Sequence, residues 1–327
     1  MNRRVLSGIR ATGRLHLGNY LGAVKGMLAL QADPNYETFY MVADLHTITT
    51  PYDPKILKEN VREVILDYLA AGLDPQKSVI FIQSQVPQHT ELGYLFSTLV
   101  TVARMQHLPT FKEKVKQHPE NVTMALLNYP VLMAADILMY KASLVPVGID
   151  QEPHLEIARE IASKINSRFG LAFPEPQRFA TSGEYVPSLT GEGKMSKSVE
   201  GSNIGLSDDL AAIREKLAKV PTDSGSGNQV PTEGGVATLL TLVELFEGKE
   251  KTEQYRKQYQ TEGIKYQDLK NELAEAIYQE LKPIQERRLE FENKPEMVDK
   301  IIEEGNEKAR QEAQKTLSEV KQAMGLI

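Results

Sequence analysis

The first half of the chain alternates short apolar runs with amphipathic helical stretches. Four runs rich in β-branched and aromatic residues predict strands at 5–9, 38–43, 78–83 and 144–149. Helical patterns separate or follow them, at 18–30, 58–74, 88–105, 121–140 (with a bend or break at Pro130) and 152–170. Strands that alternate with helices pair in parallel through crossover connections. The pattern therefore predicts an α/β fold with a doubly wound parallel sheet.

The second half of the chain has a different sequence pattern, without predicted strands. Two polar, glycine-rich segments lie at 191–203 and 221–235. The rest predicts helices alone, at 236–247, 250–260, 266–291 and 295–324. We expect three parts: an α/β domain over 1–190, a loop over 191–203 and an all-helical domain over 204–327.

Composition excludes several classes of protein. The chain has 327 residues and no cysteine, which rules out disulfides, thiolate metal sites and cysteine nucleophiles. Its net charge of −6 rules out a uniformly basic nucleic-acid coat but not a local basic face. No apolar run approaches the roughly 18 residues of a membrane span, and the N-terminus has no signal-peptide core. A cytoplasmic protein without membrane contact is expected.

Residues 12–22, TGRLHLGNYLG, form the first motif with chemical meaning. Three glycines surround His16 and Asn19 at a predicted strand-to-helix turn, where unpaired backbone N–H groups favour an anion. The two polar side chains are three positions apart and can both donate hydrogen bonds to phosphate oxygens. The spacing fits neither GxGxxG nor GxxxxGK[ST]. Taken alone, the motif is equally compatible with a glycine-rich turn that carries a surface histidine.

The second motif is the run Lys194-Met-Ser-Lys-Ser in the glycine-flanked loop. Two lysines and two serines in a flexible loop can close on a triphosphate and neutralise departing pyrophosphate. In isolation the run is no more than a solvated basic loop.

Together the two motifs resemble the signatures of the class I aminoacyl-tRNA synthetases, with HLGN (16–19) in place of HIGH and KMSKS at 194–198. The resemblance to the bacterial tryptophanyl-tRNA synthetases covers essentially the whole chain. It is carried by residues 7–23, 43–49, 81–87, 111–114, 128–140, 145–151, 193–198 and 281–288.

That resemblance implies a fold, a reaction and partners. The sheet would be of the Rossmann-like HUP type, and the helical domain would read the anticodon, with basic residues in 249–288 either contacting RNA phosphates or forming ordinary solvated faces. The enzyme would activate L-tryptophan with ATP and Mg²⁺ to tryptophanyl-adenylate, release diphosphate, charge tRNA(Trp) and act as a homodimer. Two alternatives remain: a tyrosyl-tRNA synthetase, or a synthetase-like regulatory paralogue that charges no tRNA.

The segment from Tyr129 to Asp136 favours tryptophan over tyrosine. Tyrosyl enzymes typically carry a Gln where Met133 stands, whereas an apolar Met, two alanines and a carboxylate suit an indole ring. Asp136 would accept the indole N–H; flanking apolar residues favour a buried, paired carboxylate over one on the helix surface. His46 is as compatible with a structural role as with a pocket role. The resemblance implies these tryptophan-binding residues: Leu6, Gly8, His46, Tyr129, Met133, Asp136, Val145, Val147 and Gln151. Of these, Tyr129 and Gln151 match the family positions that hold the amino group of the substrate.

The same resemblance implies the nucleotide site. Catalytic roles fall to His16, Asn19, Lys114, Lys194 and Lys197. ATP contacts fall to Arg10, Ala11, Thr12, Gly18, Asn19, Gly148, Ile149, Asp150, Val186, Lys194, Met195, Ser196, Lys197 and Ser198. No dedicated metal-ligand cage is expected, since Mg²⁺ accompanies ATP. Arg10 and Ile149 depart from the family pattern, which often has Gln and an acidic residue there, at positions that bear on ATP contact and inhibitor sensitivity.

Overall fold

The computed structural model describes residues 3–180, 183 and 185–327. These residues form two compact units, each assembled from separate parts of the chain. The described residues of the first are 3–13, 26–180 and 291–327, and those of the second are 14–25, 183 and 185–290. The units therefore do not follow the linear division expected at about residue 190, because 14–25 join the second unit and 291–327 join the first.

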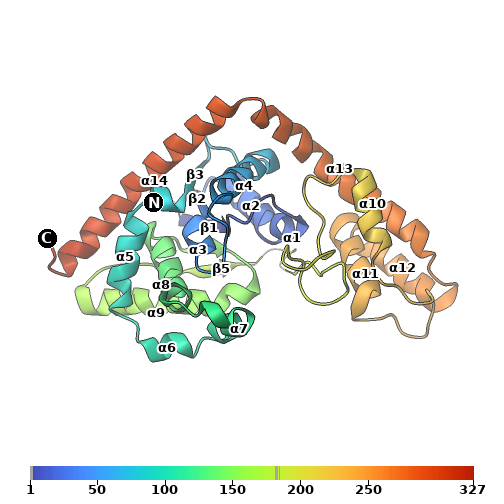
Figure 1. The fold of residues 1–327 in the computed structure, drawn as a ribbon, viewed down its shortest axis with the longest axis horizontal. Helices are drawn as coiled ribbons and strands as arrows, with labels where there is room; N and C mark the ends of the chain where they lie inside the picture. Colours follow the sequence, from blue (N-terminus) through green and yellow to red (C-terminus); the bar gives the residue numbers. More distant parts are fainter. Residues whose placement is uncertain (1–2, 181–182, 184) are drawn as a thin grey trace. The chain divides into compact units, whose positions relative to one another are not determined.

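A five-stranded sheet forms the centre of the first unit (Figure 1). Its strands are β1 (Arg3–Arg10), β2 (Tyr36–Ala43), β3 (Ser78–Ile82), β4 (Leu144–Pro146) and β5 (Gln177–Phe179). They are ordered β3-β2-β1-β4-β5, and every pair is parallel, as the alternating pattern predicts. Chain order reverses between β1 and β4, which places a topological switch point there.

Nine helices belong to the described part of this unit. They are α2 (Lys25–Ala32), α3 (Asp44–Thr47), α4 (Leu57–Ala71), α5 (Gln88–Ser97), α6 (Val102–Gln106), α7 (Pro109–Gln117), α8 (Met124–Met139), α9 (Glu152–Phe169) and α14 (Pro295–Ala323). Gly72 and Gly170 end α4 and α9 in the left-handed conformation, as their positions in the sequence predict.

The structure corrects several of the expected boundaries. The stretch 88–105 is two helices, because Leu99, Val100 and Thr101 interrupt it and the Thr101 side chain caps α6. Pro130 lies inside α8 without ending it. The polar segment after Leu108 contains α7, whose only apolar side chains beyond its first proline, Phe111 and Val115, are partly buried and too few to form an apolar run. Strand β5 is only three residues long and has no apolar run.

The core of the first unit packs aromatic rings under the sheet. Phe39 of β2 stacks on Tyr140 with ring centroids 4.6 Å apart, and Phe81 of β3 lies 5.4 Å from the same ring. All three side chains are buried. The Tyr140 hydroxyl at the end of α8 also lies 2.8 Å from His89 Nε2, so this layer is joined to a buried histidine after β3.

Helix α14 covers the outer edge of β3, the end strand of the sheet (Figure 1). Asn306 accepts the free backbone N–H of Ile82 at 2.9 Å. Gly305 approaches the strand so closely that a Cβ there would lie 1.7 Å from the carbonyl oxygen of Ile80. The helix thus occupies an edge that would otherwise offer unpaired backbone groups.

The second unit is helical. It contains α1 (Leu17–Asn19), the π-helical turn η1 (Tyr20–Val24), α10 (Leu210–Ala218), α11 (Gly234–Glu247), α12 (Lys249–Thr261) and α13 (Tyr266–Glu292). Leucine and isoleucine side chains from α10, α11 and α13 form its core. Tyr20 of η1 joins this unit through a 2.7 Å hydrogen bond to Glu280. No helix among the described residues is long and apolar enough to cross a membrane.

Candidate active site

The candidate residues of the first unit follow the carboxyl ends of its parallel strands. Arg10 ends β1, His46 lies on α3 directly after β2, and 148–151 follow β4. In register, Arg10 pairs with Ala43, and Val42 pairs with Ile82, so these strand ends lie at one edge of the sheet. Ligands of open α/β sheets bind at this edge.

Asp136 of α8 lies at the centre of a buried hydrogen-bond network. His46 Nε2 lies 2.8 Å from its Oδ2, and His89 Nδ1 lies 2.6 Å from its Oδ1. The amide nitrogen of Gln83 lies 2.9 Å from both oxygens. A carboxylate offers about four acceptor positions, so these contacts occupy all of them. The expectation of a buried, paired Asp136 therefore agrees with the structure.

The network holds Asp136 ionised. Burial alone would raise the pKa of Asp136, but hydrogen bonds from His46 and His89 outweigh burial and hold the pKa well below its usual range. His89 and Asp136 are fully buried, whereas the His46 side chain is 12% exposed. His46 therefore forms the accessible side of the network, and its ring meets Tyr129 edge-on at 6.4 Å.

A second network joins Tyr129 to the start of α9. His154 Nε2 lies 2.9 Å from the Tyr129 hydroxyl and 3.0 Å from the Thr110 hydroxyl. His154 Nδ1 lies 3.0 Å from Gln151 Oε1. Two of the predicted amino-group ligands, Tyr129 and Gln151, are thus held by one buried histidine.

Arg10 and Lys114 bring positive charge to the same unit. Arg10 Nη2 donates to the Thr50 hydroxyl at 2.7 Å, while its Nε is buried and has no hydrogen-bond partner. Burial lowers the pKa of Arg10. Burial also lowers the pKa of Lys114, and the positive charge of Arg10 lowers it further. An unsatisfied guanidinium N–H beside a second cation is suited to an anionic ligand.

The apolar candidates take different positions. Leu6 and Val145 are buried within the core, and Met133 and Val147 are partly buried against it. At Gly8 a Cβ would lie 2.6 Å from Met41 Cγ, so the absence of a side chain lets Met41 pack there. Ala11 is buried, while Thr12, Ile149 and Asp150 are exposed and Gly148 is partly buried.

His16 caps α1 in the second unit. Its Nδ1 accepts the Gly18 backbone N–H at 3.0 Å, and the Asn19 side-chain oxygen accepts the His16 backbone N–H at 3.2 Å. Because Nδ1 accepts, the ring proton resides on Nε2, which remains the donor. A Cβ at Gly18 would lie 2.8 Å from the imidazole, so only glycine fits beneath the ring.

The KMSKS loop lies beside this turn, within the same unit. Met195 is buried, its backbone N–H donates to the Val186 carbonyl at 2.9 Å, and its Cβ is near Gly18. Burial, then the charges of Lys197 and Lys194, lower the pKa of His16 to about 4. The hydroxyls of Ser196 and Ser198 lie 3.0 Å apart. The structure therefore brings the two signature motifs together, with His16 neutral at pH 7.

Sequence reasoning missed four residues of these networks: Gln83, His89, Thr110 and His154. Gln83 and His154 carried a usable signal, because Gln83 is the last residue of a predicted strand and His154 follows the carboxyl end of the next predicted strand by a few residues. His89 and Thr110 join through tertiary packing, which no local pattern encodes. Among the described residues no cluster of three or more His, Asp or Glu side chains is arranged to hold a metal ion.

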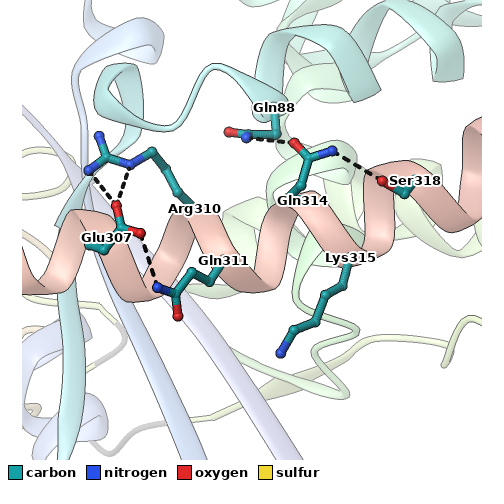
Figure 2. Close-up of a pocket in the computed structure, with 7 residues that line it drawn as sticks. All are labelled: Gln88, Glu307, Arg310, Gln311, Gln314, Lys315 and Ser318. Carbon is teal, nitrogen blue, oxygen red and sulfur yellow. Dashed lines mark hydrogen bonds and ion pairs between the residues drawn. The ribbon is translucent and has the colours of Figure 1, made fainter.

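A shallow groove elsewhere in the first unit contains none of the candidate residues. Figure 2 shows its lining of Gln88 from α5 and, from α14, Glu307, Arg310, Gln311, Gln314, Lys315 and Ser318. These polar side chains largely satisfy one another, as in the 3.1 Å hydrogen bond from Gln88 to Gln314.

Comparison with known proteins agrees with this geometry. The family model "tRNA synthetases class I (W and Y)" matches residues 1–282. The tryptophan–tRNA ligase of Rickettsia conorii is 41% identical, and the match spans 100% of both chains. The solved tryptophanyl-tRNA synthetase of Mycoplasma pneumoniae is 33% identical, with a TM-score of 0.87 over 100% of this chain and 99% of its own. That of Campylobacter jejuni, in complex with ADP and tryptophan, is 32% identical, with a TM-score of 0.83 over 99% and 100%.

The chain therefore belongs to the class I aminoacyl-tRNA synthetases of the tryptophan and tyrosine group. Within that group, bacterial tryptophan–tRNA ligases match it over essentially the full length of both chains.

Proposed function

We propose that this chain is an ATP-dependent tryptophan–tRNA ligase. It activates L-tryptophan to tryptophanyl-adenylate with release of diphosphate, and it transfers the tryptophanyl group to tRNA(Trp). The observation that carries this proposal is the buried, ionised Asp136 beside Met133 on α8. An indole N–H needs a fixed acceptor within apolar surroundings. The hydroxyl of a phenol in the same pocket would not meet this acceptor with the same geometry.

Asp136 is already saturated, so tryptophan must replace a donor. His46 is the donor on the accessible side, and its ring is not fully buried. We expect the indole N–H to take the position of His46 Nε2 at Oδ2, while His89 and Gln83 continue to hold the carboxylate. The charge on Asp136 then persists through binding.

The charge-bearing residues account for the first step. Tryptophan carboxylate attacks the α-phosphate of ATP, and negative charge moves onto the departing diphosphate. We assign His16 Nε2–H, Asn19, Lys194 and Lys197 to the triphosphate, and Lys114 to the same charge by family resemblance. The free Nε–H of Arg10 suits the carboxylate or the α-phosphate. Mg²⁺ would arrive with ATP, held mainly by phosphate oxygens and water.

Several further parts of the proposal rest on the relatives. We propose a homodimer in the cytoplasm, where ATP and tRNA meet, and anticodon recognition by the helices after residue 204. Exposed Tyr94 and Met124, each 73% accessible on α5 and α8, are apolar residues that a second subunit would cover.

An ATP–pyrophosphate exchange assay tests the proposal. We expect exchange that depends on L-tryptophan and is absent with L-tyrosine or L-phenylalanine. Exchange that depends on tyrosine would establish the tyrosyl alternative. Binding of tryptophan without exchange would favour a non-charging paralogue, against which the intact His16, Asn19, Lys194 and Lys197 argue.

A further inference from the structure

His154 is a buried histidine that the proposed chemistry does not use. It lies in the first turn of α9 and is 3% exposed. Three side chains surround it, from α7, α8 and the turn after β4: Thr110, Tyr129 and Gln151. A histidine that contacts two predicted ligands of the substrate, and no substrate itself, is in a position to set how those ligands are presented.

The hydrogen-bond partners determine the tautomer of His154. The Gln151 side-chain nitrogen donates to Asp150 Oδ2 at 2.7 Å, and a carboxylate can only accept. Gln151 Oε1 therefore faces His154 and accepts from its Nδ1–H. Burial lowers the pKa of His154 to about 4, so the ring is neutral at pH 7 and Nε2 carries a lone pair.

The neutral ring in turn determines the direction of the Tyr129 hydroxyl. Nε2 must accept, and the Tyr129 hydroxyl lies 2.9 Å away. Burial raises the pKa of Tyr129 and a hydrogen bond with Thr110 lowers it in part, and the Thr110 hydroxyl also lies 3.0 Å from His154 Nε2. With its proton directed at His154, the Tyr129 oxygen presents lone pairs outward, as does Gln151 Oε1.

We propose that His154 is a positioning residue that presents Tyr129 and Gln151 as paired acceptors for the α-ammonium group of the amino-acid substrate. The inference rests on the proposed function and deepens it. An ammonium group has three donors and no acceptor, so it requires neighbours whose own protons point elsewhere. His154 meets this requirement at both neighbours, by accepting from Tyr129 and by donating to Gln151.

Two ligands that differ in the ammonium group test the inference. L-tryptophan carries it, and indole-3-propionate keeps the indole and carboxylate but lacks it. The chain contains no tryptophan, so the fluorescence anisotropy of either ligand reports binding directly. In His154→Leu we expect L-tryptophan to bind about tenfold more weakly or worse, as for loss of hydrogen bonds to a charged group, and indole-3-propionate to change less than about twofold.

Conservative variants separate the two hydrogen bonds and guard against misfolding. His154→Gln keeps an acceptor for Tyr129, and His154→Asn keeps a donor for Gln151, so each should retain part of the affinity for tryptophan. In the Tyr129→Phe background, His154→Leu should weaken tryptophan binding less than it does in the wild type, because one of the two side chains that His154 orients has lost its hydroxyl. Exchange kinetics should show a raised KM for tryptophan with kcat and the KM for ATP nearly unchanged.

Two results would overturn the inference. The first is that the wild-type chain binds tryptophan normally and His154→Leu weakens the binding of L-tryptophan and indole-3-propionate equally, or weakens the binding of neither. His154 would then support only the shape of the pocket. If the wild-type chain fails to bind tryptophan at all, the proposed function is wrong, and this inference falls with it.

Discussion

Asp136 shows how a single buried charge depends on its neighbours. Two histidines and one amide occupy its acceptor positions. A buried carboxylate without them would be costly and would take up a proton. Its recognition role thus rests in part on His89 and Gln83, which hold the carboxylate from its buried side.

Asp136→Asn should therefore impair both recognition and stability. The new amide N–H₂ would face donors from His46, His89 or Gln83 inside the protein. We expect tryptophan activation to weaken by about 1.5–3 kcal/mol, the scale for a hydrogen bond to a charged group, and the free energy of unfolding at pH 7 to fall by about 1–3 kcal/mol.

Exchange kinetics and urea unfolding measure the two effects, and ATP binding without amino acid serves as the control that should not change. The wild-type pKa of Asp136 lies below its ordinary 3.8, so wild-type protein loses this stabilisation only as the pH falls below that value. Normal tryptophan kinetics in the variant would remove Asp136 from the pocket.

Lys197→Ala tests the KMSKS loop at the same scale. A contact that strengthens as charge moves onto diphosphate stabilises the transition state more than the bound substrates. We expect the single-turnover rate of adenylate formation to fall more than the KM for tryptophan rises. Exposed Lys249 offers a matched charge removal that should leave both unchanged. A normal rate with weakened tryptophan affinity would make the loop a lid rather than a phosphate clamp.

At the scale of elements, regular apolar runs were predictable and short polar elements were not. β1, β2, β3, α4 and α9 coincide with the sequence pattern because each has a side buried in the core. The exposed α7 and the three-residue β5 lack that signal. In the site, motifs pointed to His16 and Lys194, whereas His89 and His154 acquire their partners only when separate helices pack together.

The capping box at α1 predicts a pH dependence of stability. Burial and nearby lysines lower the pKa of His16 from 6.5 to about 4, so the unfolded chain binds a proton in this interval that the folded chain does not. The free energy of unfolding therefore falls as the pH drops from 6.5 to 4. His16→Asn keeps a good N-cap but removes the titrating ring, so stability at pH 7 should change little.

Urea unfolding at several pH values measures this difference. Between pH 4 and 6.5, the slope of the free energy of unfolding against pH should be smaller in His16→Asn than in the wild type. The difference corresponds to about one bound proton, or at most about 1.4 kcal/mol per pH unit. His154→Gln should remove a similar contribution, since its pKa is also about 4. His16→Ala, which removes the cap as well, is the contrasting variant. An unchanged slope in His16→Asn would show that His16 is already protonated at pH 6.

The contact between α14 and β3 predicts sensitivity to a single methyl group. Gly305→Ala would place a Cβ 1.7 Å from a backbone oxygen that cannot move freely. We expect the free energy of unfolding to fall by about 1–3 kcal/mol, as in overpacked cores, despite the better helix propensity of alanine. Glu303→Ala, exposed on the same helix, should be neutral or slightly stabilising. A neutral Gly305→Ala would mean that the helix shifts without cost.

At the scale of the whole molecule, charge on the second unit should govern binding of RNA. Lys249, Lys257, Lys265 and Lys282 are exposed on or beside α12 and α13. Removing one lysine–phosphate interaction reduces the slope of log affinity against log salt by roughly 0.7–0.9. We expect a variant with these four lysines changed to glutamine to bind tRNA with a shallower salt dependence, while tryptophan-dependent exchange stays normal.

Lys55, Lys58, Lys77 and Lys112 are exposed in the first unit, and changing these four to glutamine provides the control for net charge. Equal slopes for the wild type and the four-lysine variant would place the RNA-binding surface elsewhere.

Residues 295–323 close the edge of a sheet whose first strand begins at Arg3. During synthesis on the ribosome, all five strands of the sheet emerge before this helix does. A nascent chain that has reached residue 290 has all the amino-acid ligands but an open β3 edge, prone to pair with other chains. The β3 edge thus stays open until residues 295–323 have been translated, and chains that terminate before them would be substrates for chaperones and proteases rather than active enzyme.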